Sequence, residues 1–132
     1  MSRDVFPFEK DQVAILAFLS GEPLVVQDDT WLSHVAGKLC LNERVIAWYD
    51  TAGVLTVKLD GPYVQTAVRA INWMARRMGI EDCEVRYEYR PDSEGFIQYF
   101  AGDKPINLGE PWVLAGAMSV AAYRAALTYG GK

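Results

Sequence analysis

The stretch "GPYVQTAVRAINWMARRMGIEDCEVRYEYR", residues 61–90, contains the clearest helix pattern and the clearest strand pattern of the chain, in immediate succession. Its first part repeats apolar residues three and four positions apart between Gly61-Pro62 and Gly79, which predicts an amphipathic helix. The apolar positions are Val64, Ala67, Val68, Ile71, Met74, Ala75 and Met78. In residues 83–90, apolar and charged residues alternate strictly, which predicts a strand with one apolar face. That apolar face consists of Cys83, Val85, Tyr87 and Tyr89.

Further strands are predicted on both sides of this stretch. Residues 35–41, 44–50 and 54–60 are rich in strand-forming residues and are joined by short turns. Connections this short join antiparallel neighbours, so the three strands should form a meander. A short apolar run at 24–27 is a fourth strand, and residues 96–102 are the expected hairpin partner of 83–90.

Two more helices are predicted near the ends of the chain. In the first, residues 8–21, Val13, Leu16, Ala17 and Ser20 follow helical spacing, and Ile15, Phe18 and Leu19 widen the apolar stripe. The last is the segment that begins at Pro111. The predicted fold is therefore a single α+β domain, residues 1–132, in the order α-β-β-β-β-α-β-β-α. Three helices should cover a mostly antiparallel sheet of about five to six strands, a meander plus a hairpin.

The segment "PWVLAGAMSVAAYRAALTYGGK", residues 111–132, carries no charge before Arg124. This uncharged run of 13 residues is shorter than the roughly 20 that span a bilayer, so a membrane anchor is not expected. A helix that is apolar on nearly every side must be buried on nearly every side. We therefore expect this helix at the centre of the fold, with a second copy of the chain covering what the monomer leaves open, as a homodimer.

Composition narrows the class of protein. The chain is 51% apolar, which is ample for a folded core, and its net charge is −4. An acidic protein lacks the basic surface that binds nucleic acid or anionic membranes, so neither is an expected partner. Cys40 and Cys83 are too few for a disulfide framework, and the N-terminus lacks the apolar run of a secretory signal. A cytoplasmic protein with reduced thiols is predicted.

No catalytic motif occurs in the sequence. His34 is the single histidine. If residues 34–40 form one strand, His34 and Cys40 lie about 20 Å apart, too far for a nucleophilic pair. No zinc spacing occurs either. Asp28, Asp29 and Asp50 could bind a hard cation, although turns and helix caps are the more common role of such residues. We predict no catalytic residue, no metal and no cofactor.

Other charged residues have ordinary structural explanations. Acid pairs for proton transfer can be chosen freely in a chain with 17 acidic residues, so they carry little information. Such acids are Glu43, Asp50, Asp60, Asp82 and Glu84. The alternating series Glu84, Arg86, Glu88 and Arg90 is typical of the solvent face of a strand, where it forms cross-strand pairs and protects an edge.

Aromatic and arginine side chains offer the best candidate for a contact surface, because these residues dominate protein interfaces. Trp48 lies in a strand with apolar residues on both faces, so the strand is central or an aromatic side chain is exposed. The candidate binding residues are Trp73, Arg69, Arg76, Arg77, Tyr87, Tyr89 and Trp48. The alternative is that these residues belong to the core or its rim.

Two functions remain open at this stage. The first is a small non-enzymatic interaction domain, an inhibitor or accessory subunit that acts on a larger complex. Compact inhibitors of nucleic-acid-handling complexes share this size and charge, an analogy of composition alone. The alternative is a small enzyme or ligand-binding domain with His34 and carboxylates in a pocket between sheet and helices.

Overall fold

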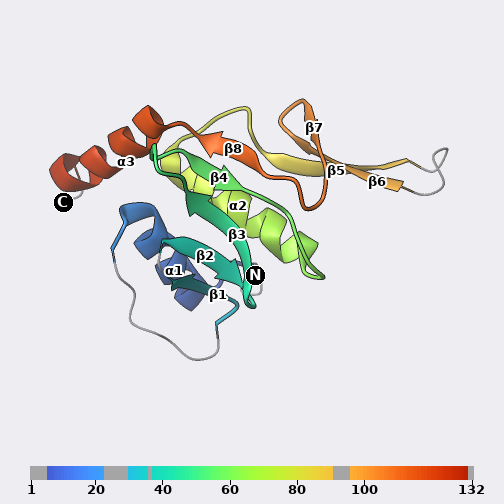
Figure 1. Ribbon diagram of the computed structural model, residues 1–132, viewed down its shortest axis with the longest axis horizontal. Coiled ribbons are helices and arrows are strands. Elements are labelled where there is room, and N and C mark those ends of the chain that lie inside the picture. The colour runs from blue at the N-terminus through green and yellow to red at the C-terminus, as the bar shows by residue number, and fades with distance from the viewer. Residues whose placement is uncertain (1–5, 23–29, 36, 91–95, 131–132) are drawn as a thin grey trace.

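The computed structural model describes residues 6–22, 30–35, 37–90 and 96–130. Within these residues the chain forms three helices and two antiparallel sheets, which confirms the predicted α+β class (Figure 1). The predicted strand at 24–27 and the turn at 91–95 lie outside the described residues. Where one sheet was expected, the strands divide into a five-stranded sheet, β1-β2-β3-β4-β8, and a three-stranded sheet, β5-β6-β7.

The order of elements extends the predicted one. The elements are α1 (Glu9–Ser20), β1 (Leu32–Val35), β2 (Lys38–Leu41), β3 (Arg44–Tyr49), β4 (Leu55–Val57), α2 (Val64–Met78), β5 (Val85–Arg90), β6 (Phe96–Ala101), β7 (Lys104–Ile106), β8 (Trp112–Ala115) and α3 (Ala117–Gly130). The predicted meander is β2-β3-β4, and the predicted hairpin is β5-β6. The strand expected at 35–41 is interrupted, because Gly37 has a φ of 79° and separates β1 from β2.

The core lies between one face of the five-stranded sheet and the helices α1 and α2. Large side chains from both layers are fully buried there: Ile15, Phe18, Leu39, Ile46, Leu55, Val57, Ile71 and Met74. On the other face, Trp48, Thr56 and Val113 lie side by side across β3, β4 and β8. No described helix covers this face, and Val113 is 58% exposed. Strand β3, which has apolar residues on both faces, is therefore covered by described helices on one face only.

Helix α1 buries one part of the broad apolar stripe that was predicted for it. Val13 is exposed, whereas Ala14, Ile15, Phe18 and Leu19 are buried. The buried carboxylate of Asp11 selects this face. Its Oδ1 accepts hydrogen bonds from the backbone N–H groups of Trp31 (2.8 Å) and Leu32 (2.9 Å) at the start of β1. Because the helix is apolar on most sides, periodicity alone could not identify the buried one.

Helix α2 forms as predicted, and Asn72 on its buried side anchors the second sheet. The Asn72 Nδ2 donates to the Val85 carbonyl oxygen at 2.9 Å, and the Val85 N–H donates to Asn72 Oδ1 at 2.7 Å. The Asn72 side chain thus makes the two hydrogen bonds that a neighbouring strand would otherwise make with Val85 at the start of β5. Beyond it the β5-β6 hairpin extends away from the body (Figure 1), so Tyr87 and Tyr89 on the same face as Val85 are 52% and 63% exposed.

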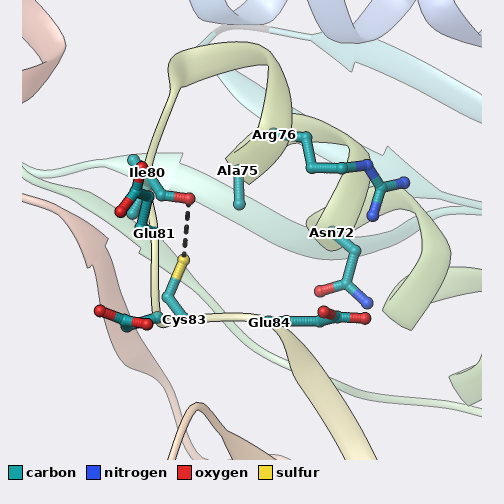
Figure 2. Close-up of a pocket in the computed structure, with 8 residues that line it drawn as sticks. Asn72, Ala75, Arg76, Ile80, Glu81, Cys83 and Glu84 are labelled. Carbon is teal, nitrogen blue, oxygen red and sulfur yellow. Dashed lines mark hydrogen bonds between the residues drawn. The ribbon is translucent and has the colours of Figure 1, made fainter.

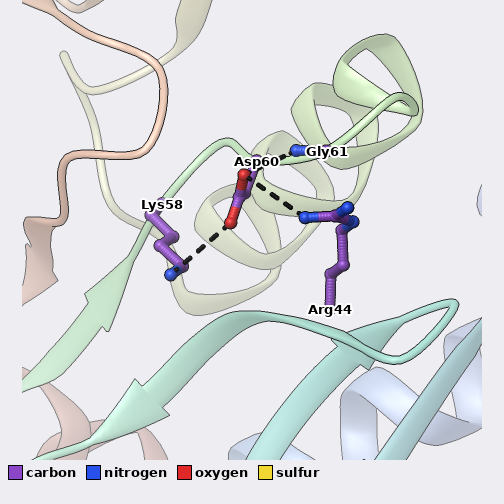
Figure 3. A network of polar contacts seen from close by, with 4 residues as sticks. All are labelled: Arg44, Lys58, Asp60 and Gly61. Carbon is purple, nitrogen blue, oxygen red and sulfur yellow. Dashed lines mark hydrogen bonds and ion pairs between the residues drawn. The ribbon is translucent and has the colours of Figure 1, made fainter.

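Asp60 organises the turn that leads into α2 (Figure 3). Its Oδ1 accepts the Gly61 N–H at 2.7 Å and lies 3.8 Å from Arg44 Nη1, and its Oδ2 lies 3.6 Å from Lys58 Nζ. Gly61 has a φ of 78°, and the Arg44 side chain occupies the space that a Cβ atom would need. The turn therefore requires glycine.

The C-terminal segment departs most from prediction. A helix was expected from Pro111, but Trp112–Ala115 forms β8 and α3 begins at Ala117. The free edge of β4 pairs with this segment, Thr56 opposite Val113. Helix α3 then extends away from the body at the end opposite the hairpin (Figure 1). The prediction of a central, buried helix is wrong, because α3 starts beyond the sheet edge and only one of its sides can reach the body.

Helix α3 is attached to the body through a few side chains. Val120 is buried, and Arg124 Nε donates to the Leu19 carbonyl oxygen at 2.9 Å. The Arg124 guanidinium also lies 4.7 Å from the ring centroid of Tyr49. Leu19 is in the last turn of α1, which has no basic residue of its own, so Arg124 places a positive charge at the negative end of that helix. The single charged side chain of α3 thus points inward.

Candidate functional site

Helix α2 presents three arginines to solvent. Arg69, Arg76 and Arg77 are exposed, and none of them forms an ion pair with a carboxylate of the described residues. The Arg77 guanidinium lies 5.6 Å from the ring centroid of Trp73, which is half-buried against the core. These arginines place three positive charges on the exposed side of α2, in a chain whose net charge is −4.

A groove of about 650 Å³ lies between the end of α2 and the flank of α3. Arg76, Arg77 and Met78 form one wall together with the segment 79–80. The α3 wall consists of five uncharged residues, Ser119, Ala122, Tyr123, Ala126 and Leu127. Their positions, i, i+3, i+4, i+7 and i+8, form one continuous face of the helix. The groove therefore combines a smooth, largely apolar wall with two arginines on the opposite side.

A second, smaller pocket of about 200 Å³ follows α2 (Figure 2). It is lined by Asn72, Ala75, Arg76, Ile80, Glu81, Asp82, Cys83 and Glu84. Cys83 Sγ lies 4.0 Å from the Ile80 carbonyl oxygen. Burial raises the pKa of the Cys83 thiol, and the negative charges of Asp82 and Glu84 raise it further. The thiol is therefore held in its protonated, unreactive form.

The residues predicted to form a contact surface fall into three groups. Trp73 and the three arginines lie on α2, and Arg76 and Arg77 also line the groove. Tyr87 and Tyr89 lie on the projecting hairpin. Trp48 is on the sheet face opposite α2, where the Lys58 ammonium lies 6.0 Å from its ring centroid. Two of the predicted contact residues, Arg76 and Arg77, therefore share a groove with α3, whereas Trp48 lies on the opposite face of the sheet.

His34 and Cys40 are closer than predicted, yet they do not form a pair. They lie on the neighbouring strands β1 and β2, where His34 is opposite Leu39, and Cys40 is opposite Ser33. The predicted separation along one strand is therefore wrong. Because successive residues point to opposite faces, His34 faces the core beside Phe18, whose ring centroid is 5.6 Å away, whereas Cys40 faces the uncovered side.

Of the three carboxylates considered for a hard cation, the structure describes Asp50. The residues that the structure describes contain no group of three or more His, Cys, Asp or Glu side chains that could hold a metal ion. Asp28 and Asp29 lie outside them. Asp50 Oδ1 accepts hydrogen bonds from Ala52 N–H at 2.8 Å and Val54 N–H at 3.0 Å, which is the turn role that its sequence context favoured.

Two of the alternating charges of β5, Arg86 and Glu88, form an ion pair within the strand. Arg86 Nη1 lies 2.7 Å from Glu88 Oε2, and the Arg86 guanidinium lies 4.5 Å from the ring centroid of Phe100 on β6. Both charged side chains are well exposed, so the pair contributes little to stability and instead keeps this face of the hairpin soluble.

We expect the stability of the protein to fall in mild acid because of His34. Burial lowers its pKa below 6.5, while a hydrogen bond with the Glu22 backbone acts in the opposite direction. The unfolded chain then binds a proton more readily than the folded one, so stability present above about pH 6.5 is lost as the pH falls. Denaturant unfolding should show this loss in the wild type and a smaller loss in His34→Gln. Identical pH profiles for the two proteins would contradict the assignment.

Both cysteines are free in the structure, and we expect them to react slowly. Burial raises the pKa of the Cys40 thiol, an effect that nearby Lys38 partly offsets, and Cys83 is shifted in the same direction. Thiol titration of the unfolded, unreduced protein should find two thiols per chain. In the folded protein both should react slowly near neutral pH and faster as the pH is raised. Rapid labelling of either thiol at pH 7 would be inconsistent with this environment.

The sequence indicated the arginines of α2 but not the groove. The signal for α3 was present, since residues 111–123 are uncharged, but that pattern was interpreted as complete burial. A charge-free helix is equally compatible with an exposed contact surface.

In the described part of the chain, no helix has the length and apolarity needed to cross a membrane. In comparisons with known proteins, the chain matches no protein family, and neither a curated protein nor a solved structure is significantly similar to it. The function is therefore argued from the geometry of the site.

Proposed function

We propose that this protein is a small non-enzymatic interaction domain that binds another protein and acts as an inhibitor or accessory subunit of a larger complex. The observation that carries the proposal is the exposed surface of α3. Met118 is 87% exposed and Leu127 42%, and the exposed residues around them are neutral. A helix in contact with water normally has a polar outer face, and a continuous apolar surface marks an interaction site.

The groove between α2 and α3 is the proposed centre of this binding surface. Arg76 and Arg77 lie beside an apolar wall, a combination that is frequent among the residues that dominate interface energetics. The net charge of −4 favours a protein partner over nucleic acid or an anionic membrane. The suggestion that the larger complex handles nucleic acid is based only on the size and net charge of this chain.

The alternative, an enzyme or ligand-binding domain, requires His34 and carboxylates in one pocket. His34 lines neither the groove nor the pocket of Figure 2, whose carboxylates come from the segment after α2. We expect His34→Ala to retain full partner binding, whereas its loss in a folded variant would favour the alternative.

The proposed function is tested with matched pairs of variants. A tagged copy is used to capture partners in its native host, and each captured protein is then purified and its affinity measured directly. Ala126→Glu and Arg76→Glu alter the groove, whereas Ala121→Glu and Arg69→Glu alter exposed positions of the same helices outside it. A purified partner should lose affinity for the first pair only. Equal affinity for all four variants would place the contact elsewhere.

A homodimer is a second proposal, supported by the outer stripe of α3. Met118, Ala121, Ala122 and Ala125 are all exposed and spaced i, i+3, i+4, i+7. An antiparallel two-fold pairing would set Met118 of each copy against Ala125 of the other, with Ala121 and Ala122 at the crossing. The contact between Met118 and Ala125 then occurs twice, as in any isologous interface, and each time a large residue meets a small one.

Sedimentation tests the homodimer. The wild type should have a mass above 14.8 kDa, and Ala121→Glu should return it to a monomer. Ala126→Glu, which lies in the groove and outside the outer stripe, should leave the dimer intact, although Ala122 belongs to both surfaces. A wild type that sediments as a monomer at high concentration would refute self-association.

A further inference from the structure

We infer that the groove between α2 and α3 accepts an amphipathic helix of the partner protein, with acidic residues along the edge that faces α2. The inference rests on the proposed function and specifies the partner of that site.

The shape of the groove suits a helix. Ser119, Ala122 and Ala126 on the α3 wall are small, so another helix can approach to the 8–10 Å axis separation of packed helices. The α3 wall extends from residue 119 to residue 127, about 12 Å along the helix axis, or roughly two turns. An occupant with apolar residues at i, i+3, i+4 and i+7 would match this length and spacing.

The backbone of the groove does not suit an extended peptide. Strand addition needs free N–H and C=O groups along an edge. The lining residues outside the helices are Gly79 and Ile80, and their N–H groups already donate to the carbonyl oxygens of Arg76 (3.1 Å) and Ala75 (2.9 Å). Side-chain packing is therefore the available mode of recognition.

The charge of the groove specifies acidic residues in the occupant. Arg76 and Arg77 are exposed and pair with no carboxylate of the described residues. The guanidinium of Arg77 is already positioned over Trp73. Guanidinium groups bind carboxylates in a fixed planar geometry, so glutamate or aspartate on the edge facing α2 would be favoured. Binding should weaken as salt is added, because these pairs lie at the solvent-exposed rim.

A displayed peptide library tests the inference without assuming a sequence. Every member is an 18-residue peptide of helix-forming residues, with one face randomised and each flanking position encoded as either glutamate or lysine. The full-length wild-type protein is the target. Selection should enrich peptides with apolar residues at i, i+3, i+4 and i+7 and glutamate along one flank. Enrichment of lysine, or no enrichment above that obtained with Arg76→Glu/Arg77→Glu, would overturn the inference.

The best selected peptide is then measured by fluorescence anisotropy. Reversal of both groove arginines should weaken it by at least about tenfold, since each reversal replaces attraction by repulsion. Arg69→Glu, on the same helix but outside the groove, should change the affinity less than about twofold. A lysine-for-glutamate peptide should recover affinity for the doubly reversed protein. Equal losses with Arg69→Glu and the double variant would show nonspecific charge attraction and overturn the inference.

The two proposals fail in different ways. If the captured partner depends on Ala126 and Arg76 but contacts them through a strand or loop, the proposed function stands and the inference of a helix is wrong. If no partner depends on the groove, the proposed function at this surface fails, whatever the library selects.

Discussion

Replacing Asn72 by leucine is expected to lower the free energy of unfolding by about 2–6 kcal/mol. Leucine fills a similar volume but leaves the N–H and C=O groups of Val85 without partners in a buried environment, at roughly 1–3 kcal/mol each. For a domain of this size the melting temperature should fall by about 10 °C or more.

Urea unfolding measures this loss, and Asn107 provides a matched control. Asn107 also makes a side-chain hydrogen bond, from its Nδ2 to Glu110 Oε1 at 3.0 Å, but on the exposed surface. Asn107→Leu should change the unfolding free energy by less than about 0.5 kcal/mol. If the two variants are equally stable, the Asn72 amide does not anchor the second sheet.

Replacing Arg124 by methionine is expected to detach α3 from the body at a cost of about 2–5 kcal/mol. The guanidinium hydrogen bond to the Leu19 carbonyl contributes roughly 1.5–3 kcal/mol, and the contact with the Tyr49 ring adds about 0.5–2 kcal/mol. Methionine keeps the length of the side chain and removes both interactions. Because Arg124 positions the α3 wall of the groove, the same change should weaken partner binding.

Hydrogen exchange locates this effect. Backbone amides of α3 should exchange faster in Arg124→Met, whereas amides of β2, β3 and β4 should keep most of their protection. Arg124→Lys retains the charge but loses the planar group, so it should fall between the wild type and methionine. Unchanged protection of α3 in Arg124→Met would show that the helix is held by Val120 and Tyr123 instead.

Part of the candidate site follows from the sequence and part does not. Arg76 and Arg77 could be selected in advance because the strong periodicity of α2 identifies its outward face, and Trp73 lies at the margin of the apolar stripe. The groove could not be predicted from the sequence, because its second wall comes from α3, which lies far along the chain from α2. Trp48 was grouped with the arginines because a sequence does not show that a sheet separates them.

What the sequence determined by itself is local. The helix at 64–78 and the strand at 85–90 follow from hydrophobic periods of 3.6 and 2 residues. The tertiary structure decided whatever depends on distant partners. Asp11 selects the buried face of α1 through the amides of β1, and the free edge of β4 turns Trp112–Ala115 into a strand. By moving the start of α3 beyond the sheet, that pairing leaves an apolar helix exposed, because the identity of a residue specifies what it can bury but not which neighbour will reach it.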